Sequence, residues 1–155
     1  MNVPDELIPG DVLFYRPSSL LGWAIALKTW FPISHVEGYA GGGRVIAARE
    51  EGVNIYTERI DQYLVAVRRP MPQPFDLGAA WMSIKDLMGP YESTGFVTFF
   101  APLMKHKEAT RICSSLITRW LRGGGCAPFN ESVQAADVSP AMLWQSPALE
   151  TVWEK

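Results

Sequence analysis

The first half of the chain alternates short apolar runs with turn signals, a pattern typical of β-strands. Pro9-Gly10 predicts a turn, and the run over 11–15 predicts a buried strand because it is rich in β-branched and aromatic residues. The glycine triplet at 41–43 predicts a tight hairpin turn. We therefore expect strands over residues 11–15, 35–40, 44–49, 53–56 and 63–69.

The rest of the chain adds helix-like spacing. We expect helices over about 18–30, 76–88 and 109–122, with Ser18 and Asp76 as N-caps of the first two. In the third helix several apolar residues fall on one face: Ile112, Leu116, Ile117, Trp120 and Leu121. The tail after Cys126 is rich in Pro and Ser, and we expect it to wrap around the surface.

Strands followed by segregated helices indicate an α+β fold, an antiparallel sheet packed against helices. The 155 residues are enough for one ordinary domain, and we expect a single domain over 1–155. With 48% hydrophobic residues the chain can build a substantial core, so a disordered chain is excluded.

Charge and cysteine content exclude several classes of function. The net charge of -2 and the pI near 5.7 do not indicate a basic surface that would bind nucleic acid or an acidic membrane. The two cysteines form no C-x-x-C pair, so we expect no structural metal and no cofactor; a disulfide between Cys113 and Cys126 stays open. The apolar stretch 20–31 is interrupted by Lys28 and predicts a buried helix, not a membrane span. Without a secretory signal, we expect a protein that is cytoplasmic as synthesised.

Cys113 and His35 are the candidates for chemistry. A cysteine nucleophile must be a thiolate, and Cys113 falls early in its predicted helix, where free backbone N–H groups favour the anion. His35 opens a predicted strand, and a rigid imidazole at that point suits a base for a thiol. Each residue also has a plain structural interpretation: Cys113 as a buried apolar residue, His35 as a polar residue at a sheet edge.

Sequence motifs favour the catalytic interpretation. The stretches 34–39 (SHVEGY) and 44–48 (RVIAA) around the glycine turn resemble the histidine hairpin of NlpC/P60 domains, and 10–14 (GDVLF) resembles the strand before it. In ordinary members the cysteine precedes these elements, whereas here the candidate stretch 111–116 (RICSSL) follows them. That order resembles the circularly permuted branch, which includes the YiiX-like proteins and the lecithin:retinol acyltransferases. The closing stretches 137–140 and 146–149 are similar to the tails of bacterial and phage members.

The resemblance implies a papain-like permuted NlpC/P60 fold, with a sheet or half-barrel against the cysteine helix. It implies a thiol peptidase or amidase with Cys113 as nucleophile and His35 as base. The implied substrate is a peptide or acyl compound, above all a peptidoglycan stem peptide, and a phage member would be associated with the virion. Two alternatives stay open: a thiol acyltransferase or esterase acting on lipids, and a degenerate structural or adaptor domain of a phage particle.

The third catalytic residue is ambiguous in the sequence. Relatives often place a polar partner for the histidine on the second hairpin strand, where this chain has Ala47. Glu37 is the nearest substitute because it lies two residues after His35, on the same strand face. An ion pair between Glu37 and Arg44 or Arg49 would count against this assignment. Glu50 or Glu51, a backbone partner, or a Cys–His dyad without a third member are the other possibilities. Tyr15 and Tyr91 are candidate hydrogen-bond donors to an oxyanion.

Overall fold

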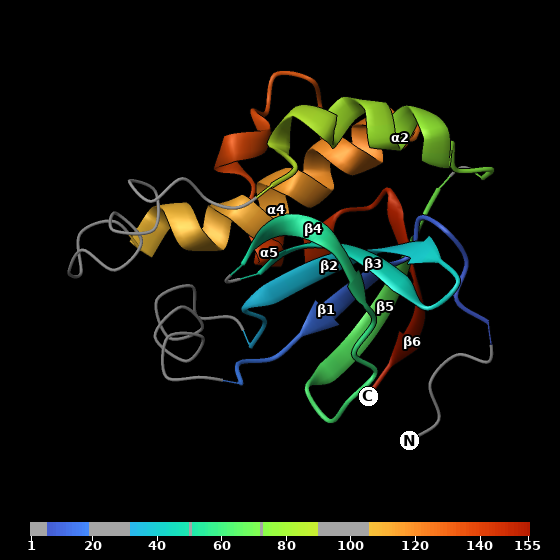
Figure 1. Ribbon diagram of the computed structural model, residues 1–155, viewed down its shortest axis with the longest axis vertical. Coiled ribbons are helices and arrows are strands. Elements are labelled where there is room, and N and C mark those ends of the chain that lie inside the picture. Colours follow the sequence, from blue (N-terminus) through green and yellow to red (C-terminus); the bar gives the residue numbers. More distant parts are fainter. Residues whose placement is uncertain (1–5, 19–31, 50, 72, 90–105) are drawn as a thin grey trace.

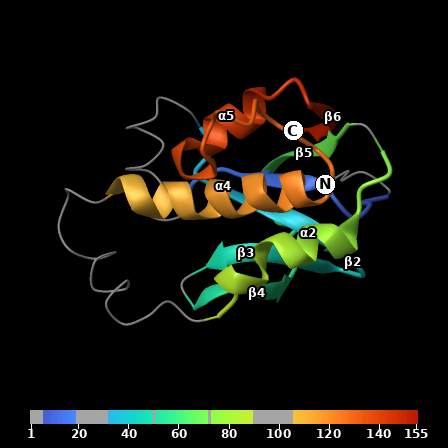
Figure 2. The same cartoon turned by 90° about the horizontal axis from the view of Figure 1, so that it is seen from above.

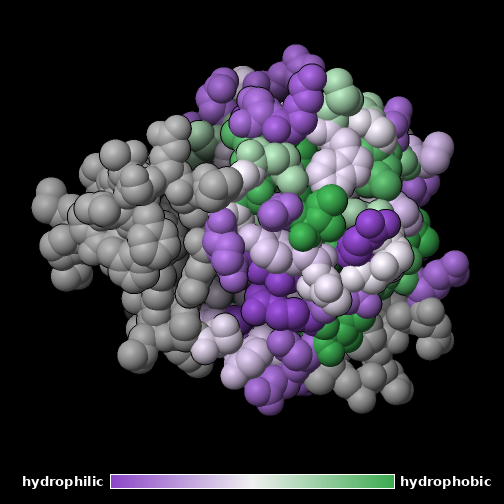
Figure 3. Space-filling view, in the orientation of Figure 1, coloured by the Kyte–Doolittle hydropathy of each residue, from purple (hydrophilic) through white to green (hydrophobic). Residues whose placement is uncertain are grey.

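The structure is a computed structural model that describes residues 6–18, 32–49, 51–71, 73–89 and 106–155, with the backbone alone for 106–112. The expected helix over 18–30 and Tyr91 lie outside the described residues. In the part that is described, no helix is long and apolar enough to cross a membrane. On the face in Figure 3, apolar patches are small and are separated by hydrophilic side chains.

One six-stranded sheet organises the described residues, and all of its pairings are antiparallel. The strands lie side by side in the order β4-β3-β2-β1-β5-β6. Their bounds are Val12–Tyr15 (β1), His35–Gly41 (β2), Arg44–Arg49 (β3), Gly52–Thr57 (β4), Leu64–Pro70 (β5) and Leu149–Glu154 (β6). Five strands come from the first half of the chain, as the hydrophobic pattern predicts, and β2 and β3 form a hairpin about the glycine turn.

The sixth strand corrects the expectation that the tail wraps around the surface. β6 pairs with β5 along an edge of the sheet, with Pro70 opposite Leu149 and Ala66 opposite Glu154. Its exposed Glu150 and Thr151 interrupt the apolar run, so a local pattern does not reveal it. A strand whose partner is distant in the sequence is selected by tertiary pairing more than by its own composition.

Helices cover one face of the sheet (Figure 1). Their bounds are Leu77–Ile84 (α2), His106–Gly123 (α4) and Pro140–Gln145 (α5), with short 3-10 turns at Lys85–Leu87 (η1) and Ala135–Asp137 (η2). Asp76 caps α2 by accepting a hydrogen bond from the Ala79 amide at 2.9 Å, which confirms the predicted start. Seen from above in Figure 2, α4 lies between α2 and α5.

The helix that carries Cys113 begins earlier than predicted. α4 starts at His106, about two turns before Cys113, so the cysteine lies in the helix interior. The added residues, 106–108, include the strong helix formers Lys107 and Glu108 and lack Gly and Pro. The prediction that free N–H groups of a helix start favour the Cys113 thiolate is therefore wrong, because those amides lie elsewhere.

Each face of the sheet carries its own apolar cluster. The cluster under the helices combines Val12, Phe14, Val36 and Ile46 of the sheet with Cys113, Leu116, Ile117 and Trp120 of α4. The cluster on the opposite face is made of Leu13, Tyr15, Tyr39, Val45, Leu64 and Val67. Successive residues of β1 thus contribute to alternate faces, as the strand period requires.

Two close contacts tie the elements of this arrangement to one another. Gly38 of β2 lies directly against Trp120 of α4: a Cβ built on Gly38 would be 2.6 Å from Trp120 Cζ3. Next to the start of β1, the fully buried Asp11 accepts hydrogen bonds from Arg69 Nε at 2.8 Å and Nη2 at 2.9 Å. Asp11 thereby ties β1 to β5 through a paired charge.

We expect Gly38→Ala to lower the free energy of unfolding by about 1–3 kcal/mol, because the added methyl group overpacks the contact between β2 and Trp120. Urea unfolding measures this change. Gly78→Ala is the matched control: its Cβ would meet nothing closer than 3.4 Å, and alanine is the better helix former, so stability should be unchanged or higher. Equal stability of the Gly38 variant and the wild type would contradict this packing argument.

Candidate active site

The site begins with two side chains on one strand. His35 and Glu37 are separated by two positions in β2 and share the face of the sheet that carries Leu13 and Tyr15. His35 Nε2 donates a hydrogen bond to Glu37 Oε1 at 3.0 Å. Since a carboxylate only accepts, this contact places a proton on Nε2 and fixes the orientation of the ring.

Glu37 is completely buried, and Arg49 compensates its charge. Arg49 donates from Nε to Glu37 Oε1 at 2.9 Å and from Nη2 to Oε2 at 3.1 Å, a bidentate pair. The same guanidinium donates to the Thr57 carbonyl oxygen at 3.2 Å and lies over the Tyr56 ring, 4.4 Å from its centroid. Arg49 therefore holds Glu37 from the end of β3 and is itself held by β4.

A second arginine approaches the same carboxylate without bonding to it. Arg59 Nη2 lies 3.7 Å from Glu37 Oε1, which is longer than a hydrogen bond, and the Arg59 side chain is 52% exposed. In contrast, the Arg49 side chain is 17% exposed and the His35 side chain 23%. Three cationic side chains thus surround one buried carboxylate.

Cys113 of α4 meets His35. Burial by itself would lower the pKa of His35, but hydrogen bonds with Cys113 and Glu37 outweigh burial and raise this pKa from 6.5 to about 9. At neutral pH the imidazole therefore carries a proton on both nitrogens. The contact joins the helix layer to the first residue of β2, and it brings together two residues that are far apart in the sequence.

Glu37 is correspondingly held as a carboxylate. Burial would raise its pKa, but hydrogen bonds from His35 and Arg49 outweigh burial and lower this pKa from 4.5 to about 2. The ionised Glu37 is the group that stabilises the imidazolium form of His35. Of the acidic candidates that the structure describes, Glu37 is the one that contacts the imidazole.

Tyr15 lies next to this pair. It is opposite His35 in the register of β1 and β2, and the two ring centroids are 6.1 Å apart. Burial and the negative charge of Glu37 raise the pKa of the Tyr15 phenol far above its ordinary value. Within the described part of the chain, its buried hydroxyl has no partner in regular hydrogen-bond geometry.

The other candidate residues lie apart from the site or outside the description. Glu51 is exposed, and Glu50 and Tyr91 fall outside the described residues. Ala47 is buried in β3 next to Ile46, the partner of Gly38, so its methyl group lies across from Glu37. Cys113 and Cys126 are both buried, and the disulfide left open by the sequence is not formed.

Sequence reasoning named Arg49 only as a competing partner of Glu37, and it gave Arg59 no role. In the structure Glu37 pairs with Arg49 and contacts His35 as well. A signal for Arg49 existed: it lies two positions after Ala47 on β3, and therefore shares a strand face with the usual place of the third residue. Arg59 had no such signal, because it follows β4 in a loop whose path the local sequence does not specify.

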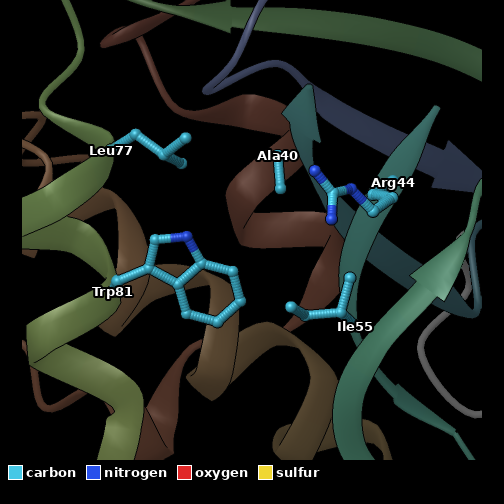
Figure 4. A pocket seen from close by; sticks show the side chains of 5 residues that line it. All are labelled: Ala40, Arg44, Ile55, Leu77 and Trp81. Carbon is cyan, nitrogen blue, oxygen red and sulfur yellow. The ribbon is translucent and has the colours of Figure 1, made fainter. Parts of the chain in front are cut away.

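A cavity of about 220 Å³ lies elsewhere, between α2 and strands β2, β3 and β4. Figure 4 shows Trp81 and Leu77 of α2 facing the strand residues Ala40, Arg44 and Ile55 across it. Ala40 is about 17 Å along β2 from His35, so this cavity is separate from the Cys113–His35 pair. Within the described ranges, no group of three or more His, Cys, Asp or Glu side chains is placed to hold a metal ion.

We expect the His35–Glu37 pair to stabilise the folded protein within a defined pH window. The His35 contribution is fully present below pH 6.5 and is lost as pH rises through about 9, because that pKa is raised on folding. The Glu37 contribution is present above pH 4.5 and is lost as pH falls through about 2. Urea unfolding of wild type and His35→Gln between pH 2 and 10 should give the largest difference between pH 4.5 and 6.5; a difference independent of pH would contradict the assignment.

Comparison with known proteins adds no relative to this geometry. No protein-family model matches the chain, and no curated protein is detectably similar to it in sequence.

Proposed function

We propose that the protein is a cysteine hydrolase of the circularly permuted NlpC/P60 type, with Cys113 as nucleophile and His35 as acid and base. The observation that carries this proposal is the contact series from Cys113 through His35 to Glu37 and Arg49. The papain-like fold is part of the same proposal, supported by the antiparallel sheet packed on α4 and by the order of the motifs.

The reaction follows from these contacts in two steps. The Cys113 thiolate attacks the carbonyl carbon of an amide or ester, and the resulting tetrahedral oxyanion collapses to a thioester as the C–N or C–O bond breaks. His35 gives its proton to the leaving group and then accepts a proton from the water that attacks the thioester. The free acid leaves, and the thiolate–imidazolium pair is restored.

Glu37 and Arg49 act as positioning residues in this scheme. Glu37 orients the imidazole through Nε2, which leaves Nδ1 as the nitrogen for exchange with the thiol. Arg49 keeps Glu37 ionised and in place, so Glu37 stabilises the imidazolium without taking its proton. The carboxylate that Ala47 cannot supply is in this way supplied from β2.

Tyr15 is the proposed donor to the oxyanion. Cys113 lies in the interior of α4, so free N–H groups at a helix start do not serve this purpose. Tyr15 has a buried hydroxyl beside His35, and its raised pKa keeps the phenol protonated over the working range of a thiol enzyme. A protonated donor aimed at developing charge is the requirement for this role.

The proposed substrate is a cell-wall stem peptide, and association with a phage particle is a further part of the proposal. Both derive from the motif resemblance. The lipid-directed alternative drew on the apolar stretch 20–31, which lies outside the described residues. The adaptor alternative drew on Ala47 and Ser115, and the contact between Cys113 and His35 counts against it.

We expect Cys113 to react with iodoacetamide at least about tenfold faster than Cys126 at neutral pH, because only Cys113 contacts an imidazolium. Burial raises the pKa of Cys126, which is 1% exposed. Mass spectrometry of the native protein after timed labelling gives both rates. Cys113 is itself 3% exposed, so a reagent must displace a neighbour to reach it.

His35→Ala is the control for this measurement, since it should bring the Cys113 rate close to that of Cys126. Equal labelling of both thiols in the wild type, or no labelling of Cys113 before unfolding, would sink the hydrolase proposal.

Glu37→Gln should lower turnover, or the rate of Cys113 alkylation at neutral pH, by about tenfold or more, because the imidazolium loses its orienting anion. The fold should persist at reduced stability, since Arg49 loses its partner. The pH profile of alkylation is the deciding readout, because a structural role alone would lower the amount of folded protein without moving that profile.

Glu51→Gln is the matched control, an identical change at an exposed glutamate, and it should leave rate and profile unchanged. If Glu37→Gln behaves like this control, the site is a Cys–His dyad or has another third member.

A further inference from the structure

The charges around Glu37 do not balance. Both Glu37 oxygens already accept close hydrogen bonds: Oε1 from His35 and Arg49, and Oε2 from Arg49. If Cys113 is a thiolate, the site contains two anions, Cys113 and Glu37. The two cations His35 and Arg49 neutralise them. Among the residues that the structure describes, Arg59 is then a surplus positive charge next to Glu37.

Arg59 differs from the other arginines that contact buried carboxylates. Arg49 and Arg69 are 17% and 24% exposed and each forms a bidentate pair, with Glu37 and Asp11. Arg59 is 52% exposed, and the nearest anionic atom among the described residues, Glu37 Oε1, lies at 3.7 Å. No described residue accepts a hydrogen bond from it, so its planar set of donors is available to another group.

The position of Arg59 relates it to the reacting atoms. Arg59 Nη2 and His35 Nε2 approach the same oxygen, at 3.7 and 3.0 Å, which bounds their separation at about 7 Å. Since His35 contacts Cys113, the distance from the guanidinium to the nucleophile is comparable with the Debye length at about 0.1 M salt, so the charge of Arg59 is felt at Cys113. A group held by Arg59 would therefore belong to the molecule that reacts with Cys113.

We propose that Arg59 is a subsite for a carboxylate of the substrate, so that the hydrolase acts on amides or esters with a free carboxylate near the scissile bond. This inference rests on the proposed hydrolase function. A guanidinium matches the two oxygens of a carboxylate. A single surplus charge suits a monoanionic carboxylate better than a dianionic phosphate.

Two alkylating reagents of similar size test the proposal, iodoacetamide, which is neutral, and iodoacetate, which carries a carboxylate. We measure the rate constants of Cys113 with both and take their ratio, iodoacetate over iodoacetamide. Arg59→Gln should lower this ratio about two- to fivefold, Arg59→Glu should lower it further, and Arg59→Lys should largely keep it. Raising the salt concentration should shrink the difference between wild type and Arg59→Gln.

Arg44→Gln is the matched control, because it removes the same charge from an exposed residue at the opposite end of β3. Its ratio should equal that of the wild type. Any general disturbance of the Glu37–His35 pair by a substitution at Arg59 changes both rates alike and cancels in the ratio.

The outcomes separate the two proposals. If Cys113 reacts faster than Cys126 but Arg59→Gln leaves the ratio unchanged, the carboxylate subsite is wrong and the hydrolase proposal stands. If neither reagent labels Cys113 faster than Cys126, the hydrolase proposal fails and the subsite fails with it.

Discussion

A carboxylate without any contact to water must be matched by cations and hydrogen bonds, and the candidate site is built around this requirement at Glu37. The matching groups come from three places: His35 from the same strand, Arg49 from the neighbouring strand and Arg59 from the loop after β4. A single anion therefore fixes the imidazole and holds the β2–β3 hairpin in register. Without it, His35 would lose both its orientation and the stabilisation of its charged form.

The fold repeats this device beside the other end of β2. Asp11, like Glu37, is completely buried and accepts a bidentate pair from an arginine, Arg69. The difference between the two sites lies in their neighbours. Asp11 holds Arg69 and the backbone amide of Ile8, so its charge is used for structure alone. Glu37 shares one oxygen with an imidazole that contacts a thiol, and the same kind of ion pair becomes part of the proposed catalytic group.

The helix layer and the sheet meet at this proposed catalytic group. Cys113 belongs to the apolar cluster between α4 and the sheet, while Glu37 lies on the opposite face with Leu13 and Tyr15. His35, the first residue of β2, contacts both Cys113 and Glu37 and so connects the two faces of the sheet. The close fit of Gly38 against Trp120 sets the distance of α4 from β2, and so the packing of the helix layer determines whether thiol and imidazole are in contact.

The sequence by itself determined the local features of this protein. Strand periodicity and the glycine turn placed His35 and Glu37 on one face of a hairpin, and Asp76 marked a helix start, because these signals depend on neighbouring residues. The tertiary structure decided what depends on distant residues. Arg49 reaches Glu37 across a strand pair, β6 finds β5 at the sheet edge, and α4 begins before the cysteine. Burial and long-range pairing, which no local pattern encodes, also turned Glu37 from one of several acidic candidates into the partner of His35.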